Sequence, residues 1–205
     1  MPTDFLLFQM DGNEEPAANL AASFRQFCAE HLAGVTVHRI AYSTEQKTLY
    51  CYAKFAVQKN ITLNQIDALQ AIWNKAFKSQ ARVSRLQLGL QPHCPSKNET
   101  PLFHYVVETD TDTGWWDEIM RWYDTEHMLG LARVPGCVSA MRLINLDARC
   151  EANDNRPRSF ACYDLTSPDV LTSAPWLAVR HTAWSDVARP HFTNTLRTMM
   201  TIIES

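Results

Sequence analysis

Glycine is scarce in this chain, with six residues among 205. Phosphate-binding loops need clustered glycines, whose backbone can approach a nucleotide closely, and no such cluster is present. This scarcity excludes the commonest nucleotide-binding enzymes. The histidines His104, His127, His181 and His191 also lack the short spacing to carboxylates that marks a metal site. We therefore expect neither a metal nor any other cofactor.

Runs of basic residues are absent as well, and the formal net charge is -3. Such a chain has no electrostatic footprint for a phosphate backbone or an anionic membrane surface. No window approaches the roughly eighteen uninterrupted apolar residues of a membrane span. The first ten residues lack the basic start and long apolar run of an export signal. We expect no nucleic-acid partner, no membrane partner and a cytoplasmic location.

Closely spaced cysteine pairs are the third absence. Neither a zinc knuckle nor a redox pair is indicated. Because 46% of the residues are hydrophobic, the chain can build a core without disulfides, and we expect reduced, mostly buried thiols. The six cysteines are Cys28, Cys51, Cys94, Cys137, Cys150 and Cys162.

The most informative stretch runs from Gly114 to Gly136. It contains tandem tryptophans, a helical stripe of aromatic residues and a Glu126-His127 pair. A weaker copy occurs in the first half of the chain, at one constant sequence separation, which indicates an internal duplication. The matched pairs are Arg25 and Arg121, Glu30 and Glu126, His31 and His127, and Gly34 and Gly130.

Periodicity predicts the same order of elements in both halves: strand, helix, strand, strand, helix, strand. In the first half these cover 5–10, 16–33, 35–42, 48–57, 63–77 and 83–90. In the second half they cover 102–108, 114–136, 138–145, 159–165, 167–188 and 196–203. The proline-rich segment between the halves lacks periodicity. We predict domains at 1–91 and 102–205, joined by a linker at 92–101.

The fold class that follows is α+β, with two tandem ferredoxin-like βαββαβ units. Each unit should form a four-stranded antiparallel sheet with two helices on one face. The other face of each sheet is apolar and must be covered. Packing the two sheets face to face, as an α+β barrel, would bury both apolar faces at once.

The second half resembles the dimeric α+β barrel superfamily, particularly its EthD-like and stress-responsive branches. The residues that carry this resemblance are Trp122-Tyr123, Glu126-His127, Val134-Pro135-Gly136 and Trp184, whereas the first half resembles the family weakly. Family members usually build the barrel from two chains, and here the fusion would supply both units. Relatives include small-molecule enzymes without metal or nucleotide, haem enzymes and proteins of unknown role.

His127 is the leading catalytic candidate. It lies in the last predicted helical turn beside Glu126, and a carboxylate can orient an imidazole and raise its pKa for general acid or base catalysis. The alternative is structural, because a cationic histidine also stabilises a helix C-terminus. Tyr163, on a predicted strand, is expected to hydrogen-bond a substrate oxygen, and its alternative is a core tyrosine with a satisfied hydroxyl.

Further side chains are expected to bind substrate, although packing alone also explains most of them. Trp116 and Tyr123 share the helix face of His127, and the others lie on predicted strands and the last helix. These candidates are Trp116, Tyr123, Arg142, His104 and Trp184.

The first functional hypothesis is a cofactor-independent enzyme of isomerase, cyclase or monooxygenase type, acting on an aromatic or polyketide-like compound in the barrel. The second is a non-catalytic ligand-binding or stress-related protein. A third alternative, ranked below both, is haem binding through His127 or His181. The expected partner is a small-molecule ligand, and a homodimer is left open.

Overall fold

The structure is a computed structural model that describes residues 1–11, 20–77, 80–148 and 157–204. The chain divides into two compact units. Unit 1 comprises Met1–Leu88, Asn145–Asp147 and Met200–Ser205, and unit 2 comprises Gly89–Ile144 and Ala148–Met199. Asn145–Asp147 and Met200–Ser205 therefore belong with unit 1, although both lie in the predicted second half of the chain.

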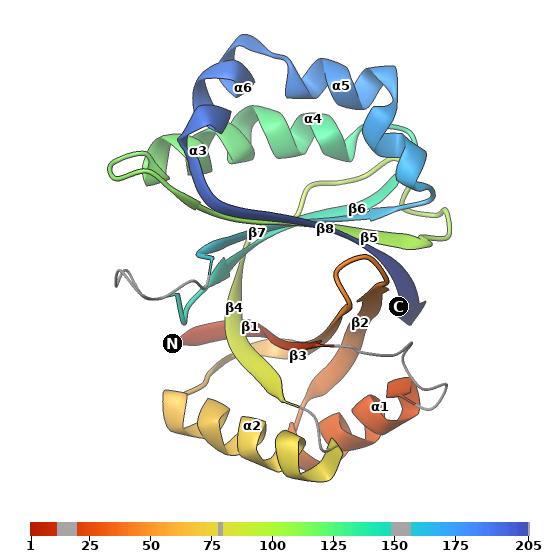
Figure 1. The fold of residues 1–205 in the computed structure, drawn as a ribbon, viewed down its shortest axis with the longest axis vertical. Coiled ribbons are helices and arrows are strands. Elements are labelled where there is room, and N and C mark those ends of the chain that lie inside the picture. Colours follow the sequence, from red (N-terminus) through yellow and green to blue (C-terminus); the bar gives the residue numbers. More distant parts are fainter. Residues whose placement is uncertain (12–19, 78–79, 149–156, 205) are drawn as a thin grey trace. The chain divides into compact units, whose positions relative to one another are not determined.

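Unit 1 has an antiparallel sheet with helices α1 and α2 on one face (Figure 1). Strand β1 lies between β3 and β4, and β2 pairs with β3 and with the end of β8. The elements are β1 (Pro2–Asp11), α1 (Leu20–His31), β2 (Val35–Ser43), β3 (Thr48–Asn60), α2 (Leu63–Phe77) and β4 (Ala81–Leu90).

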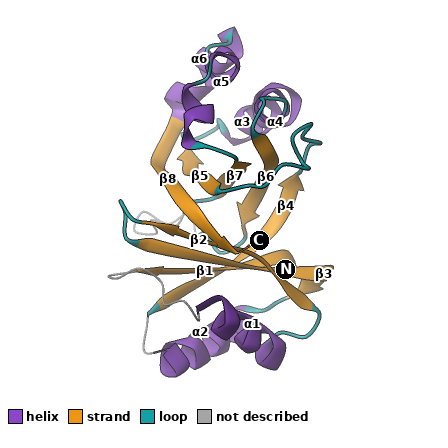
Figure 2. Ribbon diagram, turned by 90° about the vertical axis from the view of Figure 1, so that its right-hand side faces the viewer, coloured by secondary structure: helices purple, strands orange, loops and turns teal. Residues whose placement is uncertain are grey.

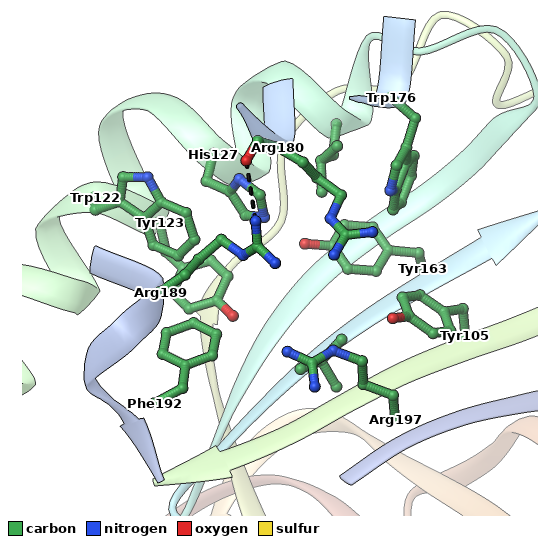
Figure 3. Close-up of a pocket in the computed structure, with 12 residues that line it drawn as sticks. Tyr105, Trp122, Tyr123, His127, Tyr163, Trp176, Arg180, Arg189, Phe192 and Arg197 are labelled. Carbon is green, nitrogen blue, oxygen red and sulfur yellow. Dashed lines mark hydrogen bonds between the residues drawn. The ribbon is translucent and has the colours of Figure 1, made fainter. Parts of the chain in front are cut away.

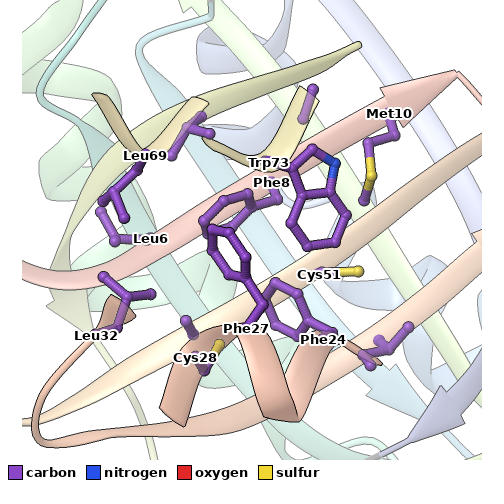
Figure 4. Packing of buried hydrophobic residues seen from close by; sticks show 14 of the residues in the cluster. Leu6, Phe8, Met10, Phe24, Phe27, Cys28, Leu32, Cys51, Leu69 and Trp73 are labelled. Atoms are coloured by element: carbon purple, nitrogen blue, oxygen red, sulfur yellow. The ribbon is translucent and has the colours of Figure 1, made fainter. Parts of the chain in front are cut away.

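Aromatic rings fill the space between the helices and the sheet of unit 1 (Figure 4). Phe8 on β1 contacts Trp73 on α2 with ring centroids 5.4 Å apart, and Phe24 and Phe27 on α1 contact both rings edge-on or tilted. All four side chains are at most 3% exposed. Burial of such large apolar surfaces is the main favourable term holding α1 and α2 on the sheet.

Unit 2 repeats this layering, with helices on one face of an antiparallel sheet (Figures 1 and 2). Its strand order is β8-β5-β7-β6. The strands are β5 (Phe103–Thr111), β6 (Cys137–Asn145), β7 (Ser159–Leu165) and β8 (Phe192–Glu204). The helical segments are α3 (Trp116–Trp122), η1 (Tyr123–His127), α4 (Met128–Ala132), η2 (Pro168–Thr172), α5 (Ala174–Arg180), α6 (Ala183–Ala188) and η3 (Arg189–His191).

Side-chain caps set several helix starts where the sequence predicts them. The Thr62 hydroxyl accepts a hydrogen bond from the Gln65 backbone N–H at 3.3 Å, and the Gln65 side chain accepts from the Thr62 N–H. Ser167 and Ser173 accept backbone hydrogen bonds at the starts of η2 and α5, each followed by a proline in the first turn. These caps satisfy N–H groups that a helix start leaves unpaired.

A π-helical turn interrupts the long helix of unit 2. It spans Tyr123–His127, between α3 and α4, and the Met128 N–H bonds to the Tyr123 carbonyl. Bonding five residues apart in place of four accommodates one extra residue, so side chains beyond the turn change their angular position. Such turns are frequent at functional sites. The sequence pattern predicts an uninterrupted helix here.

The coarse prediction of an α+β fold with antiparallel sheets is confirmed. The face-to-face barrel stays a prediction. No disulfide joins the five cysteines that the structure describes. Cys150, the predicted helix start at 16–19 and most of the loop at 149–156 lie outside the described residues. Within the described ranges, no helix has the length and apolarity to cross a membrane.

Candidate active site

A cavity of about 40 Å³ lies between the helices and the sheet of unit 2. All its lining residues belong to that unit, so this cavity is not the space between two sheets that the sequence analysis expects to hold the substrate. The residues that line it are Tyr105, Val107, Trp122, Tyr123, His127, Leu131, Tyr163, Trp176, Arg180, Arg189, Phe192 and Arg197 (Figure 3).

His127 lies at the end of the π turn, buried to 8% exposure. Its ring stacks on Trp122, with centroids 4.0 Å apart and an interplanar angle of 20°. The Nδ1 atom is buried and has no hydrogen-bond partner among the described residues. Burial, followed by the charges of Arg189 and Arg180, lowers the pKa of His127 to about 3. The imidazole is therefore neutral near pH 7 and can accept a proton.

Three tyrosines contribute phenol groups to the cavity. Tyr105 and Tyr163 are directly opposite on β5 and β7, with ring centroids 6.3 Å apart, and Tyr123 comes from the π turn. Desolvation raises the pKa of all three hydroxyls. They therefore stay protonated at neutral pH and can donate hydrogen bonds to a ligand oxygen.

Three arginines reach the same cavity from three different elements (Figure 3). Arg180 ends α5, Arg189 begins η3 and Arg197 lies on β8. The Arg189 Nη1 donates to the carbonyl oxygen of Arg180 at 3.2 Å. Burial and then the charges of Arg180 and Arg197 lower the pKa of Arg189. No aspartate or glutamate is among the described residues that line the cavity, and the charge of Asp186 offsets the decrease in the Arg189 pKa only in part.

Glu126 does not orient His127 as the sequence analysis expects. Its Oε1 accepts a 2.5 Å hydrogen bond from the Thr182 hydroxyl, which also caps α6 through the Ser185 N–H. The π turn brings His127 onto the buried face and leaves Glu126 half-buried beside α6. Glu126 thus ties the long helix to the start of α6. The sequence predicts that a carboxylate raises the pKa of His127. In the structure this pKa is lowered instead, because burial and the charges of Arg189 and Arg180 disfavour the protonated imidazole.

Two of the expected substrate-binding residues form pairs away from the cavity lining. The Arg142 Nη2 lies 2.6 Å from the Asp124 Oδ1. The His104 Nδ1 lies 2.7 Å from the Asp164 Oδ1, and these residues are opposite on β5 and β7. Because side chains alternate along a strand, His104 and Asp164 point to the sheet face opposite their neighbours Tyr105 and Tyr163.

The two expected tryptophans also lie outside the cavity lining. The Arg158 guanidinium lies 3.6 Å from the centre of the Trp116 ring. The Trp184 Nε1 donates to the Glu118 Oε1 at 2.9 Å. Both rings are half-buried, and they connect neighbouring segments of unit 2. Of the eight residues predicted for the site, the cavity thus brings together His127, Tyr123 and Tyr163.

His31 is the first-half counterpart of His127, and its surroundings are different. It lines a wider groove of about 400 Å³ in unit 1, and Lys59 is among the other described residues that line this groove. Its side chain is 31% exposed, and its Nε2 lies 3.7 Å from the Glu30 Oε2. The buried imidazole and the arginines seen in unit 2 are therefore missing from this described groove.

Sequence patterns do not indicate the three arginines or Tyr105 as site residues. Arg180, Arg189 and Arg197 lie on separate short elements, and no periodic pattern connects them. Only Tyr105 could have been found from the sequence. Side chains alternate along a strand, so Tyr105 and Val107 are expected on one face of β5, and both line the cavity. The tertiary structure alone brings the cations together.

Comparison with known proteins supports the fold. The chain matches no known family model and no curated protein sequence. An anthrone oxidase-like protein superposes with a TM-score of 0.65 and 11% identity, covering 98% of this chain and 92% of that protein. A proposed monooxygenase from Lactobacillus acidophilus NCFM gives a TM-score of 0.55 and 10% identity over 99% of this chain and 94% of the other.

A third solved structure is an uncharacterized ferredoxin-fold protein from Listeria monocytogenes that is related to antibiotic biosynthesis monooxygenases. Its TM-score is 0.51 at 10% identity, covering 99% of this chain and 96% of that one. At such identities the likeness shows the fold and carries no activity across. The chain therefore has a ferredoxin-like α+β fold, and its cavity combines a neutral imidazole, three phenols and three guanidinium groups.

Proposed function

We propose that the chain is a cofactor-independent small-molecule enzyme of monooxygenase type, with an activated aromatic or polyketide-like substrate in the unit 2 cavity. The observation that carries this proposal is the neutral His127 imidazole, stacked on Trp122 in the cavity that the phenols of Tyr123 and Tyr163 also line. The solved structures of similar fold include an anthrone oxidase-like protein, which supports this reaction class.

The proposed reaction begins with proton transfer. The imidazole of His127 takes a proton from an acidic carbon or hydroxyl of the substrate, and Tyr163 and Tyr123 donate hydrogen bonds to the oxygen that gains negative charge. The arginines stabilise that negative charge. Their positive charges also favour release of the proton from the His127 imidazolium. The apolar side chains of Trp176, Leu131 and Phe192 line the cavity and exclude water from it. This exclusion strengthens each of these interactions.

In the oxygenation step, dioxygen is the second substrate. It adds to the carbanion of a deprotonated methylene group. One oxygen atom remains on that carbon as a carbonyl, and the other leaves as water with the two hydrogens of the methylene. Isomerisation or cyclisation would start from the same carbanion, so His127 has the same role in each of these reactions.

The test uses anthrone as substrate, with dioxygen consumption followed at an oxygen electrode. We expect His127→Ala to lower kcat by about 10²- to 10⁴-fold while substrate affinity changes little. Tyr163→Phe should lower kcat less. The matched control is His181→Gln, since His181 is exposed and outside the cavity lining. Full turnover in His127→Ala would contradict the assignment of the base.

A second candidate function is non-catalytic binding of a ligand, because a cavity of about 40 Å³ does not hold a substrate ring in a reactive position without opening. A space of that size holds a small group and must open to admit a ring system. If wild type and His127→Ala both bind anthrone and neither consumes dioxygen, the binding function is the correct one.

Several finer predictions join this proposal. We infer that the two units arose by duplication and that their sheets form an α+β barrel of the EthD-like branch. Support comes from the matched pairs, such as His31 with His127, and from the similar layering of each unit. Domain ranges of 1–91 and 102–205, the cytoplasmic location and a homodimer stay predictions. Separate expression of the two halves and their reassociation would test the domain ranges.

A further inference from the structure

Two arginines of the unit 2 cavity, Arg180 and Arg189, form no ion pair with a carboxylate among the described residues. Elsewhere in unit 2, Arg142 and Arg121 each pair with a carboxylate. The charge of Asp186 raises the pKa of Arg189, but burial and the charges of Arg180 and Arg197 lower it more. The described residues that line the cavity include no aspartate or glutamate, so the cavity lining itself is cationic.

The three guanidinium groups also influence one another. Arg180 and Arg197 both lower the pKa of Arg189, which shows that their charges lie within mutual range. Arg197 additionally hydrogen-bonds the hydroxyl of Tyr105. Bringing like charges together into a partly dehydrated space is unfavourable, and a bound anion would reverse the sign of that interaction.

The positions of the arginines are set by the surrounding fold. Gly130 on α4 lies so close to Val179 on α5 that an added Cβ would come within 2.9 Å of the Val179 Cγ1. This close approach places the next residue, Arg180, over the cavity. Arg180 and Arg189 are half-buried, whereas Arg197 is exposed, so the cavity meets solvent on the side of β8.

We propose that the arginine cluster, defined as Arg180, Arg189 and Arg197, binds the carboxylate group of an aromatic carboxylic acid. The inference rests on the proposed function in calling that acid the substrate. The planar guanidinium fork matches a carboxylate, and the phenols of Tyr105 and Tyr163 can donate further hydrogen bonds. The small volume of about 40 Å³ suits a planar carboxylate better than a tetrahedral phosphate.

Carboxylate binding also has a consequence for the proposed base. Arg189 and Arg180 are the charges that lower the pKa of His127, after burial. A bound anion offsets those charges and raises the pKa of His127 toward the range in which it removes protons effectively. The substrate would thus help to activate the base that acts on it.

The experiment compares benzoate with benzamide, which has nearly the same shape and no charge. Binding is followed by tryptophan fluorescence, because Trp122 and Trp176 line the cavity. We expect wild type to bind benzoate at least about tenfold more tightly than benzamide, and the preference to weaken with added salt. Phenyl phosphate, the third probe, should bind more weakly than benzoate.

Charge-removing variants assign the preference to the cluster. Arg189→Gln and Arg197→Gln should each weaken benzoate binding by about tenfold and leave benzamide binding unchanged. Arg133→Gln is the matched control, since Arg133 is exposed and outside the cavity lining, and it should change both affinities less than about twofold. Circular dichroism of each variant verifies folding, and Arg197, being exposed, is the position least sensitive to substitution.

Three results would overturn the inference: equal affinity for benzoate and benzamide, tight benzoate binding in both arginine variants, or no benzoate binding up to about 10 mM. The proposed function fails separately. If the protein prefers benzoate but consumes no dioxygen, the anion site is supported and the proposed oxygenase function is refuted. If it turns over neutral anthrone without preferring benzoate, the oxygenase function is supported and the anion site is refuted.

Discussion

The imidazole of His127 stacks on the indole of Trp122, five residues earlier in the chain, with ring centroids 4.0 Å apart. In an α-helix, the side chains that meet are three and four residues apart. The π turn at Tyr123–His127 makes the longer spacing possible. It thereby moves the histidine under the indole and leaves Glu126 to bond Thr182. The position of the proposed base therefore depends on one local irregularity of a helix.

Replacing Trp122 should raise the pKa of His127. Burial is the largest cause of the decrease to about 3, and Trp122, which is fully buried, supplies part of that cover. In Trp122→Leu, water reaches the ring, and we expect a pKa increase of about one unit or more. An NMR pH titration of the His127 ring protons measures it. Trp184→Leu, outside the cavity lining, is the control, and an unchanged value in Trp122→Leu would refute the explanation.

His127 should make the protein less stable in acid. Its pKa is about 3 in the folded state and near 6.5 when unfolded, so between these values the unfolded chain binds more protons. The contribution to stability is complete above pH 6.5 and is lost as the pH falls toward 3, at up to about 1.4 kcal/mol per pH unit. Urea unfolding at pH 7 and pH 5 should show a smaller decrease in His127→Gln. Identical decreases in both proteins would count against this assignment.

Gly130→Ala should destabilise unit 2 and weaken ligand binding. The new Cβ would lie 2.9 Å from the Val179 Cγ1, so α5 and Arg180 must shift. Overpacking costs about 1 to 3 kcal/mol, and the better helix propensity of alanine returns about 1 kcal/mol of it. Thermal unfolding and benzoate titration measure the two effects. The double variant Gly130→Ala with Val179→Ala restores space, and its failure to recover benzoate affinity would show that α5 spacing is irrelevant.

Asp147→Asn should be strongly destabilising in unit 1. The Arg85 Nη2 lies 2.5 Å from the Asp147 Oδ1, and the side chains are 4% and 1% exposed. Removing one charge leaves the other buried without its counter-ion, at a cost of about 3 to 5 kcal/mol. The double variant Arg85→Met with Asp147→Leu should recover most of this stability.

The control for that pair is Arg25→Gln, which breaks the exposed Arg25–Glu204 ion pair and should cost less than about 1 kcal/mol. Denaturant unfolding measures all variants under one condition. A loss in Asp147→Asn no larger than that in Arg25→Gln would mean that the buried pair contributes little.

Local patterns in the sequence were sufficient for most elements. Helix α2 covers the predicted 63–77, because the Thr62 cap marks its start. Strand β7 covers the predicted 159–165, a short and mostly apolar run that is buried along its whole length. The last strand was predicted too short, at 196–203 against Phe192–Glu204. Asn194, which is unfavourable in strands and has a positive φ of 47°, interrupts the strand-forming residues at its start, and pairing with β5 overrides this local signal.

For the site, the sequence by itself determined which side chains could do acid-base chemistry, and three of the residues that it predicts for the site, His127, Tyr123 and Tyr163, line one cavity. Only the tertiary structure decided the charge around them. Arg180, Arg189 and Arg197 come from a helix, a short turn and a strand, and their meeting depends on how those elements pack. Periodicity reports which face of one element is apolar, whereas an electrostatic environment is a sum over all elements, so no single stretch of sequence contains it.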